Sequence, residues 1–279
     1  MSKSDFSLAS ILGIIVSAFF IWVFLFSVWY SNNILNQDKF IEITNKVLQS
    51  ESTRSAISNE VISIIKARRP IVGTISEPLL SNLLTSVMSS ELYSNVTVRM
   101  SRQLQLQLTS ANPRELQVEL SPAKTLLNPI FERADSDLLE RVPDNIVVLR
   151  KNQIPSLYKF GTYLTVSGPI LLVIGLIMLG LIWRRISDKR EYIVILSLTF
   201  AASGLLVYFL VPAVGNYVVA QTDSVNIATI LNEVYTAFTA PISQFSSYVI
   251  VGGVLIALIA KFVRRELFKL PERSTNKSK

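Results

Sequence analysis

The sequence lacks cysteine and histidine altogether among its 279 residues. Without cysteine there is no disulfide and no thiolate nucleophile, and without histidine there is no imidazole base. The common zinc sites, which are built from these two residue types, are excluded as well. Charge is also scarce, because Asp, Glu, Lys and Arg make up only 17% of the chain, against about a quarter in soluble domains. The uncharged residues form long apolar blocks, which excludes an ordinary cytosolic globule and a disordered tail.

Four of these blocks are long enough to cross a membrane, for which a helix needs about 20 apolar residues. They predict transmembrane helices at residues 8–30, 160–183, 192–214 and 245–263. Residues 1–30 thus hold a short N-terminus and the first span. Aromatic residues gather near the ends of the blocks, as is typical of residues at the membrane–water interface. They include Trp29, Tyr30, Tyr158, Phe160, Trp183 and Tyr192.

The orientation follows from the charges in the short loops. Residues 184–191, between the second and third spans, and the tail after the fourth span are rich in Lys and Arg, whereas loop 215–244 has neither. Positive loops stay in the cytoplasm. The sequence therefore predicts cytoplasmic N and C termini, a plasma (inner) membrane location, and extracytoplasmic segments 31–159 and 215–244. Long translocated segments escape the charge rule, so the Lys and Arg of 31–159 do not contradict this.

Segment 31–159 is long enough for one small domain. Apolar residues at helical spacing dominate its first two thirds, with stripes such as Phe40, Ile43 and Val47, or Leu92, Val96 and Met100. Further helices are expected to begin at Ser76 and Ser121. The alternation at 116–120 and the apolar run 146–149 indicate two short strands. The predicted fold is mainly α: four transmembrane helices plus a small helical extracytoplasmic domain with a short two-stranded β-ribbon.

The amphipathic loop 215–244 contains one more predicted helix, capped by Ser224, with Ile227, Leu231, Val234 and Phe238 among its apolar stripe. Such a stripe would be an exposed patch in water. It packs on the outside domain or lies along the membrane surface. We favour packing on the domain, because the helix lacks the Lys and Arg of interfacial anchors.

No catalytic, cofactor-binding or metal-binding residues are predicted. The acidic stretch from Asp135 to Glu140 suggests a carboxylate pair or calcium ligands, but it lacks the EF-hand spacing and fits a solvated face better. Phosphate loops, dinucleotide fingerprints and nucleophile elbows are absent from the sequence. The predicted spans carry no ionisable residue away from their ends, which argues against an ion-coupled carrier. Nucleic-acid binding has no support beyond the net charge of +7.

Small residues at spacing four indicate where helices can approach closely. Ala9, Gly13 and Ser17 form such a pattern in the first span, and Gly253 and Ala257 form one in the fourth. The pattern is compatible with packing inside the chain or with a homo-oligomer.

Basic residues near the predicted cytoplasmic ends are candidates for contacts with lipid head groups. They are Arg184 and Arg185 after the second span, and Arg264 and Arg265 after the fourth. The same residues also serve simply as the topology signal.

The layout, with one span, a helical outside domain and three closely spaced spans, resembles an uncharacterised family of bacterial integral membrane proteins that is frequent in actinobacteria. The matching pieces are SESTRSAISNEVISII, SSELYSNVTVRMSRQLQLQL, LQVELSPAKTLL, the WRR that closes the second span, and VYTAFTAPISQFSSYVIVGGVLIALIA. The resemblance implies a plasma-membrane protein with an extracytoplasmic domain, and it carries over no functional residues.

The topology is also similar to that of MacB and FtsX-like permease subunits, which place a large outside domain between the first two spans. In that interpretation the RRISDKRE link would couple to a separate ATPase. The mainly helical pattern of the outside segment departs from that group. The sequence therefore favours a non-enzymatic membrane protein whose outside domain binds or organises an envelope partner, with the permease subunit as the alternative.

Overall fold

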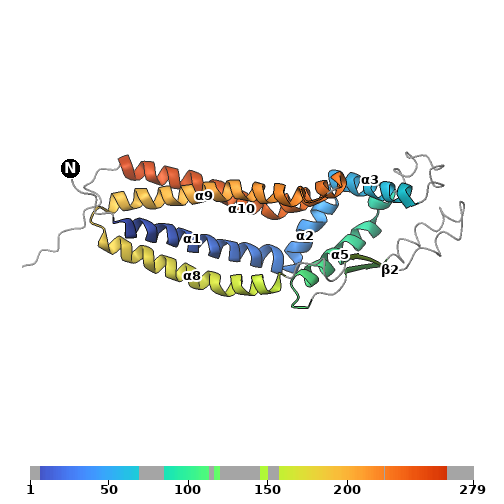
Figure 1. Ribbon diagram of the computed structural model, residues 1–279, viewed down its shortest axis with the longest axis horizontal. Helices are drawn as coiled ribbons and strands as arrows, with labels where there is room; N and C mark the ends of the chain where they lie inside the picture. The colour runs from blue at the N-terminus through green and yellow to red at the C-terminus, as the bar shows by residue number, and fades with distance from the viewer. Residues whose placement is uncertain are drawn as a thin grey trace, which may run out of the picture. The chain divides into compact units, whose positions relative to one another are not determined.

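A computed structural model of the chain describes residues 7–68, 85–112, 116–119, 145–149, 157–222 and 224–262. In chain order the elements are α1 (Leu8–Tyr30), the π-helical turn η1 (Ser31–Leu35), α2 (Gln37–Leu48), α3 (Glu51–Arg68), α5 (Glu91–Leu108), β1 (Leu116–Glu119), β2 (Asn145–Leu149), α8 (Tyr158–Arg185), α9 (Lys189–Val219) and α10 (Val225–Phe262) (Figure 1). The described part is mainly helical, as predicted. The helices predicted to begin at Ser76 and Ser121 lie outside the described residues, as does the acidic stretch 135–140.

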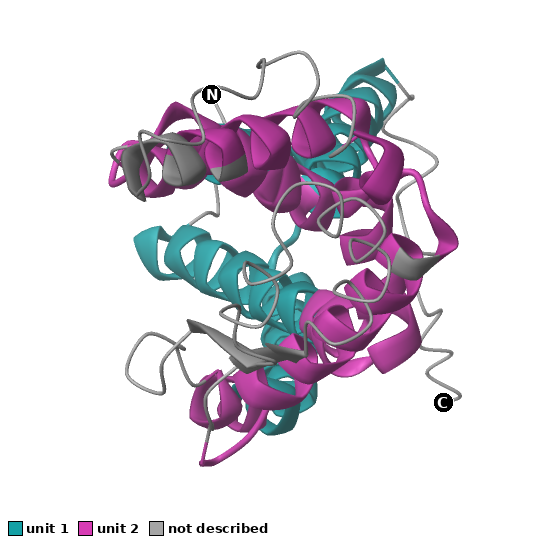
Figure 2. Cartoon of the chain, turned by 90° about the vertical axis from the view of Figure 1, so that its right-hand side faces the viewer, with its two compact units in different colours: residues 1–27, 164–213, 240–279 teal, residues 28–163, 214–239 magenta. Residues whose placement is uncertain are grey.

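The chain divides into two compact units (Figure 2). Unit 1 consists of residues 1–27, 164–213 and 240–279, and unit 2 consists of residues 28–163 and 214–239. The four long helices α1, α8, α9 and α10 each contribute residues to both units.

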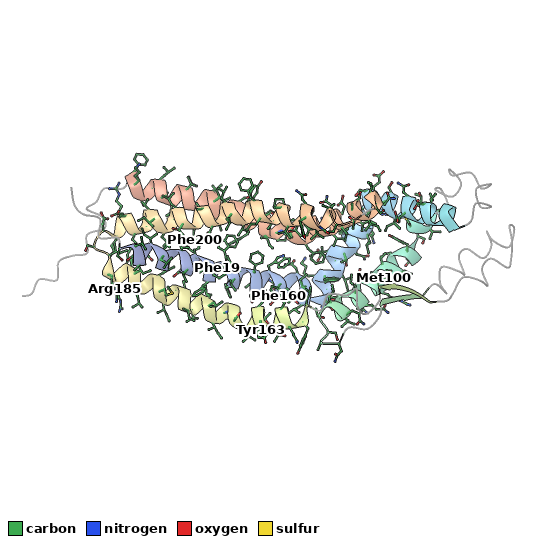
Figure 3. All side chains as sticks on the ribbon, in the orientation of Figure 1. Phe19, Met100, Phe160, Tyr163, Arg185 and Phe200 are labelled. Atoms are coloured by element: carbon green, nitrogen blue, oxygen red, sulfur yellow. The ribbon has the colours of Figure 1, made fainter. Side chains whose placement is uncertain are left out.

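Four helical stretches, Leu8–Leu35, Tyr158–Arg185, Lys189–Val219 and Val225–Phe262, are long and apolar enough to cross a membrane. They indicate a multi-pass integral membrane protein in contact with a lipid bilayer, and they confirm the four predicted blocks as helices. Large apolar side chains on them are exposed, such as Phe19 at 63% (Figure 3). Small residues such as Ser17 and Ala257 are buried instead. Lipid tails solvate apolar side chains, so helices in a bilayer bury small residues against one another.

The fourth span differs from its prediction in where its helix begins. The sequence divides this region into an amphipathic loop helix and a span that begins at residue 245, whereas α10 is one helix from Val225 to Phe262. Pro241 lies inside α10 and is exposed. Proline interrupts the backbone ladder without ending the helix when the surroundings hold both sides in place. Only residues 220–224 therefore separate α9 from α10.

In unit 2, α2 packs against α5. Asn36 caps α2 by accepting a hydrogen bond from the Lys39 amide at 3.1 Å, and Ser90 caps α5 in the same way. The buried face of α5 is polar: Thr97, Ser101 and Gln105 follow one another at helical spacing, and each is less than a tenth exposed. Val96 and Met100 of the apolar stripe predicted for this helix are only partly buried, so polar side chains make up more of this contact than the sequence pattern suggests.

Thr97 and Gln105 of α5 pair with α2 and with η1, whereas the Ser101 hydroxyl has no hydrogen-bond partner. Thr97 Oγ1 donates to Asn45 Oδ1 at 2.8 Å. Gln105 Nε2 donates to the carbonyls of Ile34 and Leu35 at 3.0 and 3.2 Å. These carbonyls belong to η1, whose wider winding leaves backbone acceptors for side chains to satisfy.

β1 and β2 pair antiparallel, with Gln117 opposite Val147, Val118 opposite Ile146 and Glu119 opposite Asn145. The pairing is irregular between Leu116 and Gln117. These strands fall in the two segments for which the sequence predicts them. After the ribbon, the Leu157 amide donates to the Leu108 carbonyl at 2.9 Å, which ties the start of α8 to the end of α5.

Candidate functional site

The contact of α1 with α8 in unit 1 depends on glycines of α8. A Cβ added at Gly168 would lie 2.6 Å from the Cβ of Ser27, and one at Gly175 would lie 3.3 Å from the carbonyl oxygen of Ser17. Real Cβ atoms almost never approach other atoms as closely as the first distance, so the α1 surface fits against Gly168 only because its side chain is missing.

Three of the four glycines of α8 recur every seven residues, because Gly161 precedes Gly168 by the same interval; Gly180 lies outside this repeat. In unit 2 a Cβ at Gly161 would meet the ring of Tyr30. The phenol of Tyr30 donates to the Leu157 carbonyl at 3.1 Å. A seven-residue interval keeps residues on one face of a helix that crosses its neighbour at a small angle. Sequence reasoning missed this repeat, although it is visible in the sequence once that interval is searched.

The predicted small-residue pattern of α1 is only partly engaged in contacts. Gly13 lies against α8, where an added Cβ would be 2.8 Å from Ile182 Cδ1. Ser17 is fully buried, and its hydroxyl donates to the Gly13 carbonyl at 2.8 Å. Ala9 is exposed. Of the three residues on the predicted face, two therefore lie in or beside a helix contact.

The contact of α9 with α10 uses one glycine from each helix. A Cβ at Gly253 would lie 2.6 Å from the Ser197 carbonyl oxygen, and one at Gly204 would lie 3.2 Å from the Ser246 carbonyl oxygen. Ala257, one turn beyond Gly253, is buried. The two helices approach backbone to backbone at Gly253, the glycine that the spacing pattern singles out.

One polar contact joins α1 to α9 inside unit 1. Trp22 Nε1 donates to Ser203 Oγ at 2.9 Å, and Ser203 Oγ donates in turn to the Phe200 carbonyl at 2.8 Å. The Trp22 ring meets Phe245 of α10 edge to face, with centroids 6.0 Å apart. Trp22 thus contacts two neighbouring helices at once, and its indole nitrogen has a hydrogen-bond acceptor within the apolar bundle.

The predicted lipid-contact residues Arg184 and Arg185 are exposed in the last turn of α8. Arg185 is labelled in Figure 3. Arg264 and Arg265 lie outside the described residues. The neighbouring cations are engaged with the protein: Arg190 Nε donates to the Ala260 carbonyl at 2.6 Å, and Lys189 Nζ donates to the Ile186 carbonyl at 2.6 Å. Arg184 and Arg185 are therefore the described cations of this link that extend toward the surroundings.

The first turns of α10 pack within unit 2, as favoured by the sequence analysis. The rings of Phe238 and Phe40 lie 5.2 Å apart, and both side chains are buried. Trp29 Nε1 donates to the Phe238 carbonyl at 2.9 Å. Ser52, at the start of α3, donates to Glu233 at 2.7 Å. Phe238 of the apolar stripe thus packs on Phe40 of α2, and Glu233 meets α3, whereas Ile227 of the same stripe is 40% exposed.

Glu60 of α3 receives two hydrogen bonds from the start of α10. Asn226 Nδ2 lies 3.0 Å and Ser224 Oγ 2.8 Å from Glu60 Oε2. These two donors, that of Asn226 first, lower the pKa of the Glu60 carboxyl, because they stabilise its charged form. Ser224 also caps α10 through the Ile227 amide at 3.4 Å, so the carboxylate of Glu60 orders the capping residue.

A polar cavity of about 430 Å³ lies along α3, and we call it the α3 cavity. Its lining residues come from the end of α2, the first turns of α3 and residues 85–88. They are Gln49, Glu51, Arg54, Ser55, Ser58, Asn59, Thr85 and Met88.

Two buried polar atoms of this lining have no hydrogen-bond partner. They are Arg54 Nε and Ser58 Oγ. A buried donor left without a partner costs about 1–3 kcal/mol. Burial raises the pKa of the Tyr93 phenol, and the positive charge of Arg54 opposes that rise, so the guanidinium and the phenol are neighbours. Sequence reasoning did not single out Arg54 or Ser58, because an isolated Arg and Ser on an amphipathic helix give no motif.

Within the part of the chain that the structure describes, no group of three or more acidic side chains is placed to hold a metal ion. The lining of the α3 cavity thus offers hydrogen-bonding groups, one negative charge from Glu51 and one positive charge from Arg54. This set of groups can bind a polar ligand.

Neither family models nor curated proteins nor solved structures match this chain.

Proposed function

We propose that this chain is a non-enzymatic protein of the plasma (inner) membrane, with both termini in the cytoplasm. Its unit 2 lies outside the cytoplasm and binds or organises a partner in the cell envelope. The observation that carries the proposal is which segments of the chain make up unit 2. Residues 28–163 and 214–239 form one compact unit, and these are nearly the two segments that the loop charges assign to the same side.

The charges of the links between the described helices support the same orientation. The link from α8 to α9 is flanked by Arg184, Arg185, Lys189 and Arg190. The turn from α9 to α10, residues 220–224, has no Lys or Arg. Since cationic loops remain in the cytoplasm, the first link is cytoplasmic and the second is outside.

Labelling of single cysteines tests this orientation, and the natural absence of cysteine makes the parent chain a silent control. Ser187→Cys lies in the link from α8 to α9, Gln221→Cys lies in the turn from α9 to α10, and Glu42→Cys lies on α2; all three residues are exposed. A membrane-impermeant maleimide applied to intact cells is expected to label the variants at 221 and 42. The variant at 187 is expected to react only after the membrane is permeabilised. The reverse pattern would overturn the orientation.

Cross-linking from unit 2 tests for the partner. A photoreactive residue placed at exposed positions of α2 or α5, such as Glu42 or Arg99, is expected to capture an envelope protein or a second copy of the chain. The same residue at the buried Phe40 is the matched control. Stable co-purification of an ATPase would instead favour the permease subunit of the MacB and FtsX-like type. Capture of neither would contradict a scaffold role.

A further inference from the structure

Three buried hydroxyls in the described helices have no hydrogen-bond partner, those of Thr53, Ser58 and Ser101. Of these three, Ser58 lines the α3 cavity. Ser17, Thr44 and Ser246 each donate to the carbonyl one turn earlier, at 2.7 to 2.8 Å. This local bond is the usual way to satisfy a hydroxyl inside a helix. Ser58 is only 6% exposed, yet its hydroxyl makes no such bond. A residue of the cavity lining thus carries a hydroxyl that has no partner within the protein.

Arg54 lies one turn before Ser58 on the same face of α3, and its buried Nε also has no hydrogen-bond partner. Guanidinium and hydroxyl donors together recognise a carboxylate, which accepts several hydrogen bonds at once. Two unpartnered donors on one helix face, both at the same cavity, therefore point to a ligand with a carboxylate group.

Glu51 supplies the opposite charge at the same cavity. Glu51 and Arg54 stand three residues apart on α3, a spacing that favours an ion pair. Yet among the described residues the ion pair that forms is Lys39 with Glu42, and none joins Glu51 to Arg54. The cavity therefore offers one separate charge of each sign, and these charges sum to zero. This balance disfavours a dianion such as a phosphate monoester and suits a molecule that carries both signs.

The remaining lining residues and the cavity size agree with a small ligand of this kind. Asn59 and Ser55 add amide and hydroxyl groups that bind further polar atoms. The volume of about 430 Å³ is far more than the roughly 30 Å³ that one water occupies. A free amino acid or a dipeptide fits within it.

We propose that the α3 cavity binds a zwitterion of the amino-acid type, either a free amino acid or a short peptide. Arg54 and Ser58 bind its carboxylate, and Glu51 binds its ammonium group. This inference goes beyond the proposed function. It rests on that function only for the side of the membrane from which the ligand arrives. Binding by the purified protein does not depend on the orientation of the chain in the membrane.

The test is calorimetric titration of the full-length protein in detergent with the free amino acids and with alanyl-alanine, followed by acetate and ethylamine as single-charge probes. Saturable binding of at least one zwitterion is expected, with acetate and ethylamine binding at least tenfold more weakly. No saturable binding of any zwitterion at millimolar concentration would overturn the proposal. Acetate that binds as tightly as the best zwitterion would also overturn it.

Single substitutions test which residue binds each charged group of the ligand. Arg54→Gln is expected to weaken binding of the zwitterion at least tenfold. Glu51→Gln, at an exposed position that leaves the fold intact, is expected to weaken the zwitterion by a similar factor and to leave acetate unchanged. Ser58→Ala is expected to weaken it several-fold. Arg99→Gln, which removes an exposed arginine of α5 outside the lining, is the control. An unchanged affinity in Glu51→Gln, or an equal loss in Arg99→Gln, would refute the assignment.

The cysteine labelling described above reports orientation alone. Failed labelling with intact zwitterion binding would therefore refute the proposed function and leave this inference standing. The opposite pair of results would refute only the inference.

Discussion

Gly252 and Gly253 are adjacent in α10, and their surroundings differ enough to give a matched pair of variants. A Cβ at Gly253 would lie 2.6 Å from the Ser197 carbonyl oxygen and 3.0 Å from the Cβ of Ala201. At Gly252 an added Cβ would meet nothing within 4 Å. Gly252→Ala and Gly253→Ala thus make the same chemical change in the same helix, and they differ only in what the new methyl group contacts.

The expected free energies follow from two effects. Alanine is about 1 kcal/mol more favourable than glycine in a helix, so Gly252→Ala is expected to be as stable as the parent or slightly more stable. Overpacking costs about 1–3 kcal/mol. The carbonyl oxygen that faces Gly253 belongs to backbone and cannot rotate away, so that cost applies in full. Gly253→Ala should therefore unfold with a free energy about 1–3 kcal/mol below that of Gly252→Ala.

Reversible unfolding in mixed detergent and SDS micelles, followed by helical circular dichroism, measures this difference. Both variants gain the same helix propensity from alanine, so this contribution cancels in the difference between their free energies of unfolding. It would not cancel if either variant were compared with the parent alone. If Gly253→Ala proved as stable as Gly252→Ala, then the close backbone contact of α9 with α10 would be refuted.

Three further changes probe unit 2, each followed by chemical unfolding of the purified protein. Phe40→Ala should lower the free energy of unfolding by about 3–5 kcal/mol, because Phe40 is 3% exposed and packs on Phe238; a loss below 1 kcal/mol would contradict that packing. Gln105→Leu should cost about 1–3 kcal/mol, because two carbonyls of η1 lose their donor, and no loss would mean that these bonds contribute little. The pKa of the Glu60 carboxyl is lower in the folded state than its value near 4.5 in the unfolded chain. The stability that this carboxylate contributes is therefore present above pH 4.5, and it is lost as the pH falls through the folded-state pKa. Glu60→Gln should flatten the stability profile below about pH 4.5 and leave its shape at higher pH unchanged, and an unaltered acid limb would show that the Asn226 contact is not formed.

The existence of the four membrane helices is predictable from the sequence because the requirement is simple: enough consecutive apolar residues to match the bilayer. The charged link predicts that the second span ends at residue 183 and the third begins at 192, whereas α8 continues to Arg185 and α9 begins at Lys189. The start of the fourth helix differs by more. The sequence pattern begins this span at residue 245, but α10 begins at Val225 and continues through Pro241. A proline is a local signal, and packing on both sides of it decides whether the helix ends.

The packing details were harder to predict. Spacing-four patterns single out Gly13 and Gly253, which do face neighbouring backbones or side chains, and also Ala9, which is exposed. Spacing shows which residues share a face and does not show whether another helix covers that face. The α3 cavity was not predictable at all. Its character comes from hydroxyl and guanidinium groups that lack partners, and a missing partner is visible only in three dimensions.

The paired glycines of α9 and α10 restrict how these two helices can move. Gly204 faces Ser246 while Gly253 faces Ser197, so the two close contacts are spaced by the same interval on both antiparallel helices. Axial sliding by even one residue, about 1.5 Å, would push a side chain toward backbone at both places together. Piston-like displacement of one helix along the other is therefore blocked. Any motion that passes through this pair must tilt or rotate both helices as a single rod.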